Sequence, residues 1–177
     1  MGDRQIHSEP HRRCSGAATY GGRAGALVSD AVKAADPAYS AKGVALDAHV
    51  EPDVPAIEAD GERIAEVLVN LLTNALRHTP PGGIVNVLAQ QRDDQLEIAV
   101  VDNGEGIAPE HIGRVFERFY RIDPARSRAS GGTGIGLAIV RAIVEAHGGT
   151  VTATSPGTGS GSGTTVTVLL PIHRRPT

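Results

Sequence analysis

The segment from Asp60 to His78 carries a helical pattern that is apolar around most of its circumference, and this limits the possible folds more than any other feature. A helix of this kind must be largely buried against other elements. Three polar residues spaced by four, Glu66, Asn70 and Asn74, form a single seam along it. A buried, unpaired amide costs about 1–3 kcal/mol, so these side chains need protein, water or ligand partners. The seam alone is equally consistent with a solvated strip and with a binding site.

The remaining pattern predicts an α+β chain with helices on one face of a mixed, mostly antiparallel sheet. Asp60 is expected to cap the central helix, Pro37 to end the first one, and Asp93–Asp94 to form the turn of a hairpin. The elements that the pattern predicts, in chain order, are helix 24–35, strand 43–50, helix 61–78, strands 83–90 and 95–102, a short helix from 109, helix 135–147, and strands 150–155 and 164–171. A polar, glycine-rich loop is predicted at 120–134. The segment "PGTGSGSG" is predicted to be a flexible connection between the last two strands.

Composition narrows the class of protein. The 177 residues suit one domain at 23–172, with a flexible tail or leader at 1–22 and a short tail at 173–177. A net charge of −3 gives no electrostatic case for nucleic acid or an anionic membrane. The single cysteine, Cys14, fits a reducing, cytoplasmic setting, and no apolar run is long enough to insert into a membrane. We expect the isolated domain to be monomeric.

Two glycine clusters follow the central helix. Asp102-Asn103-Gly104-Glu105-Gly106-Ile107 comes directly after a strand, and its carboxylate could accept a hydrogen bond from a base, although a simple turn has the same residues. The cluster at 131–136 leads into a helix, where free N–H groups suit phosphate. It follows a polar loop instead of a strand, which argues against a dinucleotide fingerprint, and no Gly-Lys-Ser/Thr follows, which excludes a P-loop.

In this order the segments resemble the ATP-binding catalytic domain of bacterial sensor histidine kinases, in the Bergerat-fold (GHKL) superfamily. "NLLTNALRHTP" is similar to the N box, "VDNGEGI" to the G1 box, "VFERFYR" to the F box, "GGTGIGLAIV" to the G2 box and "GSGTTVTVLLP" to the final strand. The likeness covers about residues 24–171. It implies a two-layer α/β sandwich, with three main helices packed on the sheet and a mobile ATP lid.

The resemblance also implies roles for individual residues. Asn74 would be the Mg²⁺ ligand, a role that suits an amide oxygen, with Asn70 beside it at the phosphates. Arg77 and Arg121 would neutralise charge on the transferred phosphoryl group, and Asn70 would complete this catalytic set. Phe116 and Phe119 would anchor the lid. The other residues implied at the nucleotide are His78, Asp102, Gly104, Gly106, Ile107, Phe119, Gly132, Thr133, Gly134, Ile135, Gly136, Leu137 and Thr164.

The identity of residue 70 bears on the reaction. Superfamily members that hydrolyse ATP have a glutamate four residues before the magnesium asparagine, whereas this chain has Asn70, which cannot act as a base for water. Glu66 lies one turn further away and could either polarise a proton, orient Arg77 or be a structural group. The resemblance therefore favours a protein-histidine kinase. An anti-sigma-type serine kinase on the same fold and a nucleotide-binding pseudo-kinase module remain the alternatives.

No histidine of the chain lies in the sequence context of a phosphoacceptor. His111 is expected on a helix surface and His147 at a helix end. We therefore expect this chain to be an excised catalytic domain or one half of a split kinase. Its partners would be a dimerisation domain carrying the phosphoacceptor histidine and a downstream response regulator, and the attacking imidazole would arrive in trans, beneath a mobile lid.

Overall fold

The computed structural model describes residues 24–54, 56–57, 59–122, 134–159 and 161–172. The predicted tails and most of the predicted lid lie outside these residues. The elements, in chain order, are α1 (Ala24–Lys42), β1 (Ala45–Val50), α2 (Gly61–His78), β2 (Ile84–Arg92), β3 (Gln95–Asp102), α3 (Pro109–Ile112), α5 (Gly136–Ala146), β4 (Thr150–Thr154) and β5 (Thr164–Pro171). None of the helices described here is both long and apolar enough to cross a bilayer.

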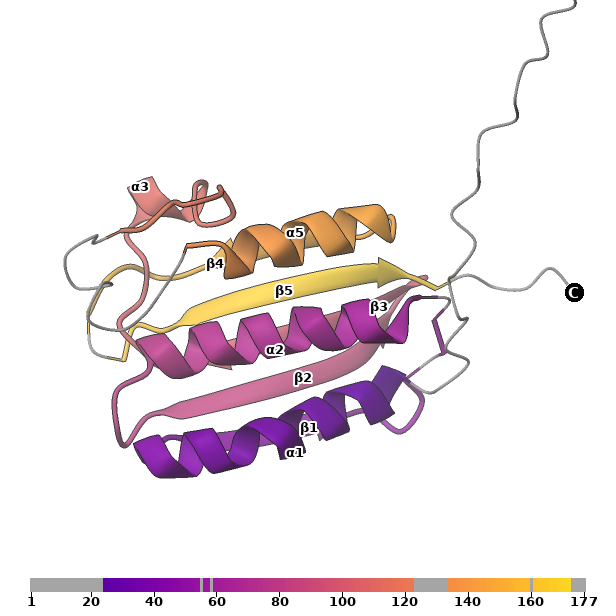
Figure 1. Ribbon diagram of the computed structural model, residues 1–177, viewed down its shortest axis with the longest axis horizontal. Helices are drawn as coiled ribbons and strands as arrows, with labels where there is room; N and C mark the ends of the chain where they lie inside the picture. The colour runs from indigo at the N-terminus through magenta and orange to yellow at the C-terminus, as the bar shows by residue number, and fades with distance from the viewer. Residues whose placement is uncertain (1–23, 55, 58, 123–133, 160, 173–177) are drawn as a thin grey trace, which may run out of the picture.

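The strands form one mixed sheet in the order β1-β2-β3-β5-β4. β1 runs parallel to β2, and the other pairs are antiparallel. Helices α1, α2 and α5 lie side by side over one face of this sheet, while α3 lies apart from them near the start of α5 (Figure 1). The predicted α+β class and the two-layer arrangement are therefore confirmed. The hairpin between β2 and β3 turns at Asp93–Asp94, as predicted.

The core lies between the sheet and α2. Alternate residues of β2 and β5 are buried, as expected for strands with one covered face. Full burial of an aliphatic side chain stabilises the fold by about 1.5–3 kcal/mol. The apolar layer between the sheet and α2 therefore supplies most of the free energy that favours folding. The buried side chains of α2 are Ile64, Val67, Leu68, Leu71, Leu72 and Ala75, and those of the sheet include Val85, Val87, Leu96, Ile98, Val166 and Val168.

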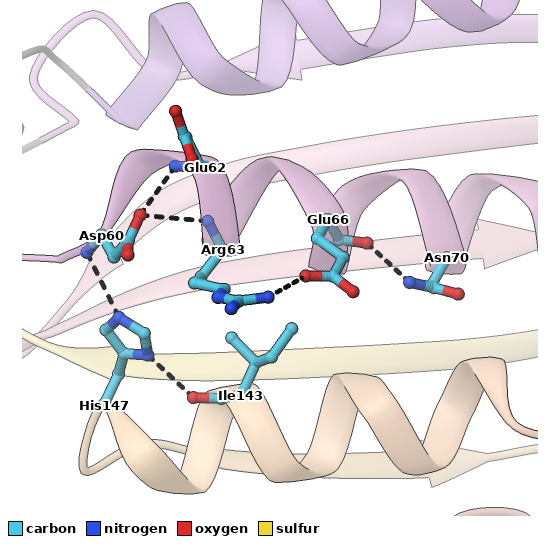
Figure 2. Close-up of polar contacts among 7 residues, drawn as sticks. All are labelled: Asp60, Glu62, Arg63, Glu66, Asn70, Ile143 and His147. Atoms are coloured by element: carbon cyan, nitrogen blue, oxygen red, sulfur yellow. Dashed lines mark hydrogen bonds and ion pairs between the residues drawn. The ribbon is translucent and has the colours of Figure 1, made fainter.

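The start of α2 is capped as predicted. Asp60 Oδ1 accepts hydrogen bonds from the N–H groups of Glu62 and Arg63, at 3.0 and 3.3 Å. His147, at the end of α5, accepts from the Asp60 N–H at its Nε2 (3.2 Å), while its Nδ1 lies 2.8 Å from the Ile143 carbonyl (Figure 2). Because the carbonyl is only an acceptor, Nδ1 carries the proton. His147 thus joins the end of α5 to the cap of α2.

The prediction that Pro37 ends the first helix is wrong, because α1 continues through it to Lys42. A proline inside a helix removes one hydrogen bond and crowds the carbonyl four residues earlier. The turn after Pro37 is held by contacts with α2: the buried Tyr39 hydroxyl donates to the Leu72 carbonyl at 2.8 Å, and Lys42 Nζ donates to carbonyls in the last turn of α2. These tertiary contacts outweigh the local penalty.

We predict that Pro37→Ala stabilises the protein. Pro37 is exposed, so alanine restores the missing hydrogen bond without disturbing the core, and the free energy of unfolding should rise by about 1–2 kcal/mol. Urea unfolding followed by circular dichroism measures this change. Ser40→Ala, at an exposed position in the same helix, is the control and should change stability by less than about 0.5 kcal/mol. An unchanged midpoint for Pro37→Ala would contradict the prediction.

Candidate nucleotide-binding site

Segments far apart in the chain meet at one end of the sheet. The last turn of α2, the end of β3, the first turn of α5 and the beginning of β5 all lie toward the same end, on the left in Figure 1. Contacts confirm this gathering: β3 residue Asp102 pairs with β5 residue Thr164, and the first residue of α5 lies against Asn70 of α2. Most of the residues that the sequence predicted for the site are therefore brought together.

Asp102 is the charged residue at the centre of this end. Its exposed fraction is 9%, and its Oδ1 accepts hydrogen bonds from the N–H groups of Gly104 (2.9 Å) and Thr164 (3.1 Å). Burial raises the pKa of Asp102, and the two backbone N–H groups and the nearby His78 oppose that rise. Both backbone bonds use Oδ1, so Oδ2 has capacity to accept another donor.

The glycines around Asp102 are required by close backbone contacts. A Cβ at Gly104 would collide with the His78 carbonyl, which accepts a hydrogen bond from the Glu105 N–H at 3.2 Å. Gly163 has φ +69, and a Cβ there would collide with the Asp102 carbonyl. The chain can therefore approach the end of α2 and the end of β3 only where these side chains are missing.

The segment between β4 and β5 connects these strands, as predicted, and its described residues lie along the 104–107 loop. The Gly159 N–H donates to the Glu105 carbonyl at 2.8 Å, and the Gly163 N–H donates to the Gly104 carbonyl at 3.2 Å. Gly106 and Thr158 form an isolated antiparallel β-bridge. Ser155 Oγ also accepts from the Ile107 N–H at 2.9 Å. Sequence reasoning missed Ser155 and Gly163, since no local pattern reports a partner so distant in the chain.

A cavity of about 220 Å³ borders Asp102 at this end of the sheet. Residues of the loop between β4 and β5 form part of its wall, including Ser155 and Ser162. Thr164, which was predicted at the nucleotide, lies in the same wall, and its side chain is buried. The β4–β5 loop therefore both backs the 104–107 loop and lines this cavity.

The polar seam of α2 is partly buried at Glu66, Asn70 and Asn74. Asn70 Nδ2 donates to the Glu66 carbonyl at 2.8 Å, and Glu66 Oε2 forms an exposed ion pair with Arg63 Nη1 at 2.9 Å (Figure 2). The suggestion that Glu66 orients Arg77 is not supported, because its carboxylate is directed back toward the start of the helix. Arg77 and His78 occupy the last turn of α2, as predicted.

The segment after α3 has two aromatic residues with different surroundings. Phe116 packs against the core, whereas Phe119 is 71% exposed and has φ +64, an unusual conformation for a side chain of this size. The Phe119 N–H donates to the Gly134 carbonyl at 2.9 Å. Most of the lid that the two residues were predicted to anchor lies outside the described residues, and the contacts seen are the packing of Phe116 and the backbone hydrogen bond of Phe119. Its ring borders a hollow of about 260 Å³ between α2 and α5.

Tyr120, at the end of this segment, contacts two neighbouring side chains. His111 lies on α3 and is partly exposed, and its Nδ1 lies 2.6 Å from the Tyr120 hydroxyl. The Arg114 guanidinium stacks over the Tyr120 ring, 4.2 Å from its centre.

The Arg121 side chain has buried nitrogens without partners: its Nε and Nη2 are shielded from solvent and have no hydrogen-bond partner in the described part of the chain. An arginine in that state suits an anionic ligand.

The first turn of α5 has the properties expected at a phosphate. Its N-cap residue, Ile135, provides no side-chain cap, so the first N–H groups of the helix have no such partner. Gly134 precedes it with φ +67, and Leu137 packs against the core. The predicted site residues Gly132 and Thr133 lie outside the described residues, as does most of the predicted lid.

A comparison with known families identifies the architecture. The model of the family described as "Histidine kinase-, DNA gyrase B-, and HSP90-like ATPase" matches residues 59–174. The chain belongs to this family. ATP binding is the property that the family implies, and the resemblance found in the sequence motifs is confirmed.

Individual relatives are sensor histidine kinases. The sensor histidine kinase CusS of Escherichia coli O157:H7 is 50% identical over 95 residues, which are 54% of this chain and 20% of CusS. The structure of the mycobacterial sensor histidine kinase MprB is 30% identical with a TM-score of 0.70, covering 82% of this chain and 92% of that one. Full-length ShkA in complex with AMPPNP is 26% identical with a TM-score of 0.76, covering 93% of this chain and 33% of that one. The chain spans 20–26% of the length of the first curated relatives.

We predict that Asp102→Asn raises the melting temperature at pH 7. Burial raises the Asp102 pKa above its ordinary value of 3.8, so the folded chain binds this proton more tightly than the unfolded chain. The carboxyl therefore favours folding below about pH 4 and disfavours it as the pH rises through and beyond that value. Asparagine is uncharged throughout, so its advantage should be present at pH 7 and shrink in acid.

Thermal unfolding of the variant and the parent between pH 3 and pH 8 tests this. Asp47→Asn, at an exposed position on β1, is the matched control and should leave the curve unchanged. A variant that is less stable by the same margin at every pH would contradict the prediction.

Proposed function

We propose that this chain binds ATP–Mg²⁺ and donates the γ-phosphoryl group to a histidine on a separate dimerisation domain, as the catalytic half of a two-component sensor histidine kinase. The proposal rests chiefly on one observation: Asn70 of the α2 seam lies against the uncapped first turn of α5, at the same end of the sheet as the buried Asp102 carboxylate. The structure of full-length ShkA in complex with AMPPNP supports the binding of an adenine nucleotide by this chain.

The carboxylate would select the base. Asp102 Oδ1 is already satisfied by two backbone N–H groups, which fixes the carboxylate in place. Oδ2 would then accept a hydrogen bond from the amino group of adenine. Thr164 and the 104–107 loop, including Gly104, Gly106 and Ile107, would complete the base pocket, with His78 beside it.

The phosphates would lie between α2 and α5. The unpaired Arg121 nitrogens and the uncapped N–H groups of α5 are consistent with an anion there. Asn74 would offer a neutral oxygen to Mg²⁺, which when bound would neutralise charge on the phosphate oxygens. Arg77 and Arg121 would stabilise charge on the group being transferred. The glycines and backbone of 132–137 would border the phosphates.

The chemistry of residue 70 favours transfer over hydrolysis. Asn70 cannot accept a proton from water, and its amide nitrogen is engaged by the Glu66 carbonyl. The nearest carboxylate along the seam, that of Glu66, forms an ion pair with Arg63. The site would therefore hold ATP without activating water, and the nucleophile would be a histidine that arrives in trans. A response regulator would receive the phosphoryl group afterwards.

We predict that the purified chain binds ATP–Mg²⁺ yet labels no residue of its own, and that it labels a histidine-bearing dimerisation domain added in trans. Incubation with γ-labelled ATP, with and without separately purified dimerisation domains, measures this. Asn74→Ala should abolish transfer while metal-free nucleotide still binds, because only the metal ligand is lost. Acid-labile label on the lone chain, or transfer by Asn74→Ala at the parent rate, would refute the proposal.

We predict that Asp102→Asn weakens binding of ATP by about 1–3 kcal/mol, because an amide N–H₂ would face the amino group of adenine. Calorimetry with a non-hydrolysable ATP analogue measures the loss. Inorganic triphosphate, which has no base, is the matched control ligand, and its affinity should not change. Equal affinity of parent and variant for the ATP analogue would contradict the role of Asp102.

A further inference from the structure

Gly136, the first residue of α5, faces a single neighbouring side chain. A Cβ atom at this position would lie 3.0 Å from Asn70 Oδ1, 3.8 Å from Asn70 Cγ and 4.0 Å from Asn70 Cβ, and these three atoms of Asn70 are its nearest neighbours. The backbone of Gly136 is outside the left-handed region, so a side chain is permitted by conformation. The obstacle to a side chain at Gly136 is therefore the carboxamide of Asn70.

The orientation of that carboxamide is set from the other side. Asn70 Nδ2 donates to the Glu66 carbonyl one turn earlier in α2, at 2.8 Å. This bond distinguishes the two ends of the amide, because only the nitrogen can donate. With the nitrogen directed back along α2, the oxygen is directed to the first turn of α5. Figure 2 shows the Asn70 side chain and its bond to Glu66.

Glycine is a poor choice for a helix start unless its lack of a side chain has a use. It is among the weakest helix formers, and alanine at the same place would favour the helix. Space is the property that Gly136 provides here, in contrast to Gly134, whose φ of +67 requires glycine by conformation. A Cβ contact of 3.0 Å forces a neighbour to move, and the neighbour in question is Asn70.

We propose that Gly136 is a positioning residue: its missing side chain keeps the Asn70 carboxamide seated between the Glu66 carbonyl and the first turn of α5, with Oδ1 directed to the phosphate side of the site. The consequence for phosphoryl transfer rests on the proposed function. The steric coupling itself does not, since it exists in the chain without ligand. Gly136→Ala should displace Asn70 Oδ1, whereas the same substitution where nothing opposes a Cβ should have no effect.

A double-mutant cycle tests the coupling without nucleotide. Gly136→Ala should lower the melting temperature of the parent by roughly 2–4 °C, and should leave it unchanged or raise it in an Asn70→Ala background, where the opposing oxygen is gone. The side-chain amide resonances of Asn70 in a ¹⁵N spectrum should shift in Gly136→Ala. Gly113→Ala is the matched control, because a Cβ there meets nothing within 4 Å. The same shift in melting temperature in both backgrounds would overturn the coupling.

Transfer in trans tests the functional step. Gly136→Ala should reduce the rate constant for phosphoryl transfer at least tenfold while nucleotide affinity changes less than threefold, and Gly113→Ala should match the parent in both. If the parent chain transfers no phosphoryl group, the proposed function is contradicted. The coupling between Gly136 and Asn70 is then tested by the double-mutant cycle alone. If the double-mutant cycle shows coupling but Gly136→Ala transfers at the parent rate, the role of Gly136 in positioning Asn70 for transfer is overturned. The proposed function is not affected by that outcome.

Discussion

The burial of α2 against a sheet that is covered on one face is the constraint on which the other features depend. Its apolar residues belong to the same core cluster as the buried residues of the sheet, so the helix has a fixed rotation about its axis. That rotation leaves Glu66, Asn70 and Asn74 along the boundary of the core, neither free in solvent nor sealed within the protein. The same seam then meets α5, and the end of the helix meets the loop after β3. Core packing therefore determines where the amides point.

Both ends of α2 are held by residues from other elements. Asp60 and His147 secure its start against the end of α5, and Lys42 of α1 engages the carbonyls of its last turn. The loop after β3 is in turn held on two sides, by the His78 carbonyl and by the segment between β4 and β5. Burial raises the pKa of Asp102, and the backbone N–H groups of Gly104 and Thr164 oppose that rise, so this network offsets part of the cost of burying the carboxylate.

The sequence predicted the features that depend on local pattern. The cap at Asp60, the turn at Asp93–Asp94 and the seam of α2 follow from neighbouring residues, and all were found. The prediction that failed concerns a position where distant contacts decide the outcome. Pro37 does not end α1, because Tyr39 and Lys42 hold the next turn against α2. The glycine-rich segment after β4 is held by Ser155 and Glu105, and its composition indicated only a loop.

The glycines of the site show why a motif cannot be interpreted from composition alone. Gly104 and Gly163 make room for backbone, at the His78 and Asp102 carbonyls, so their replacement would separate whole segments. Gly136 makes room for one side-chain oxygen, so its replacement would alter the direction of a single amide. Gly113 has open space around it. A glycine that looks identical in sequence can therefore control the backbone path, the geometry of one polar group, or neither, and only the second kind lets a helix terminus tune a residue on another helix.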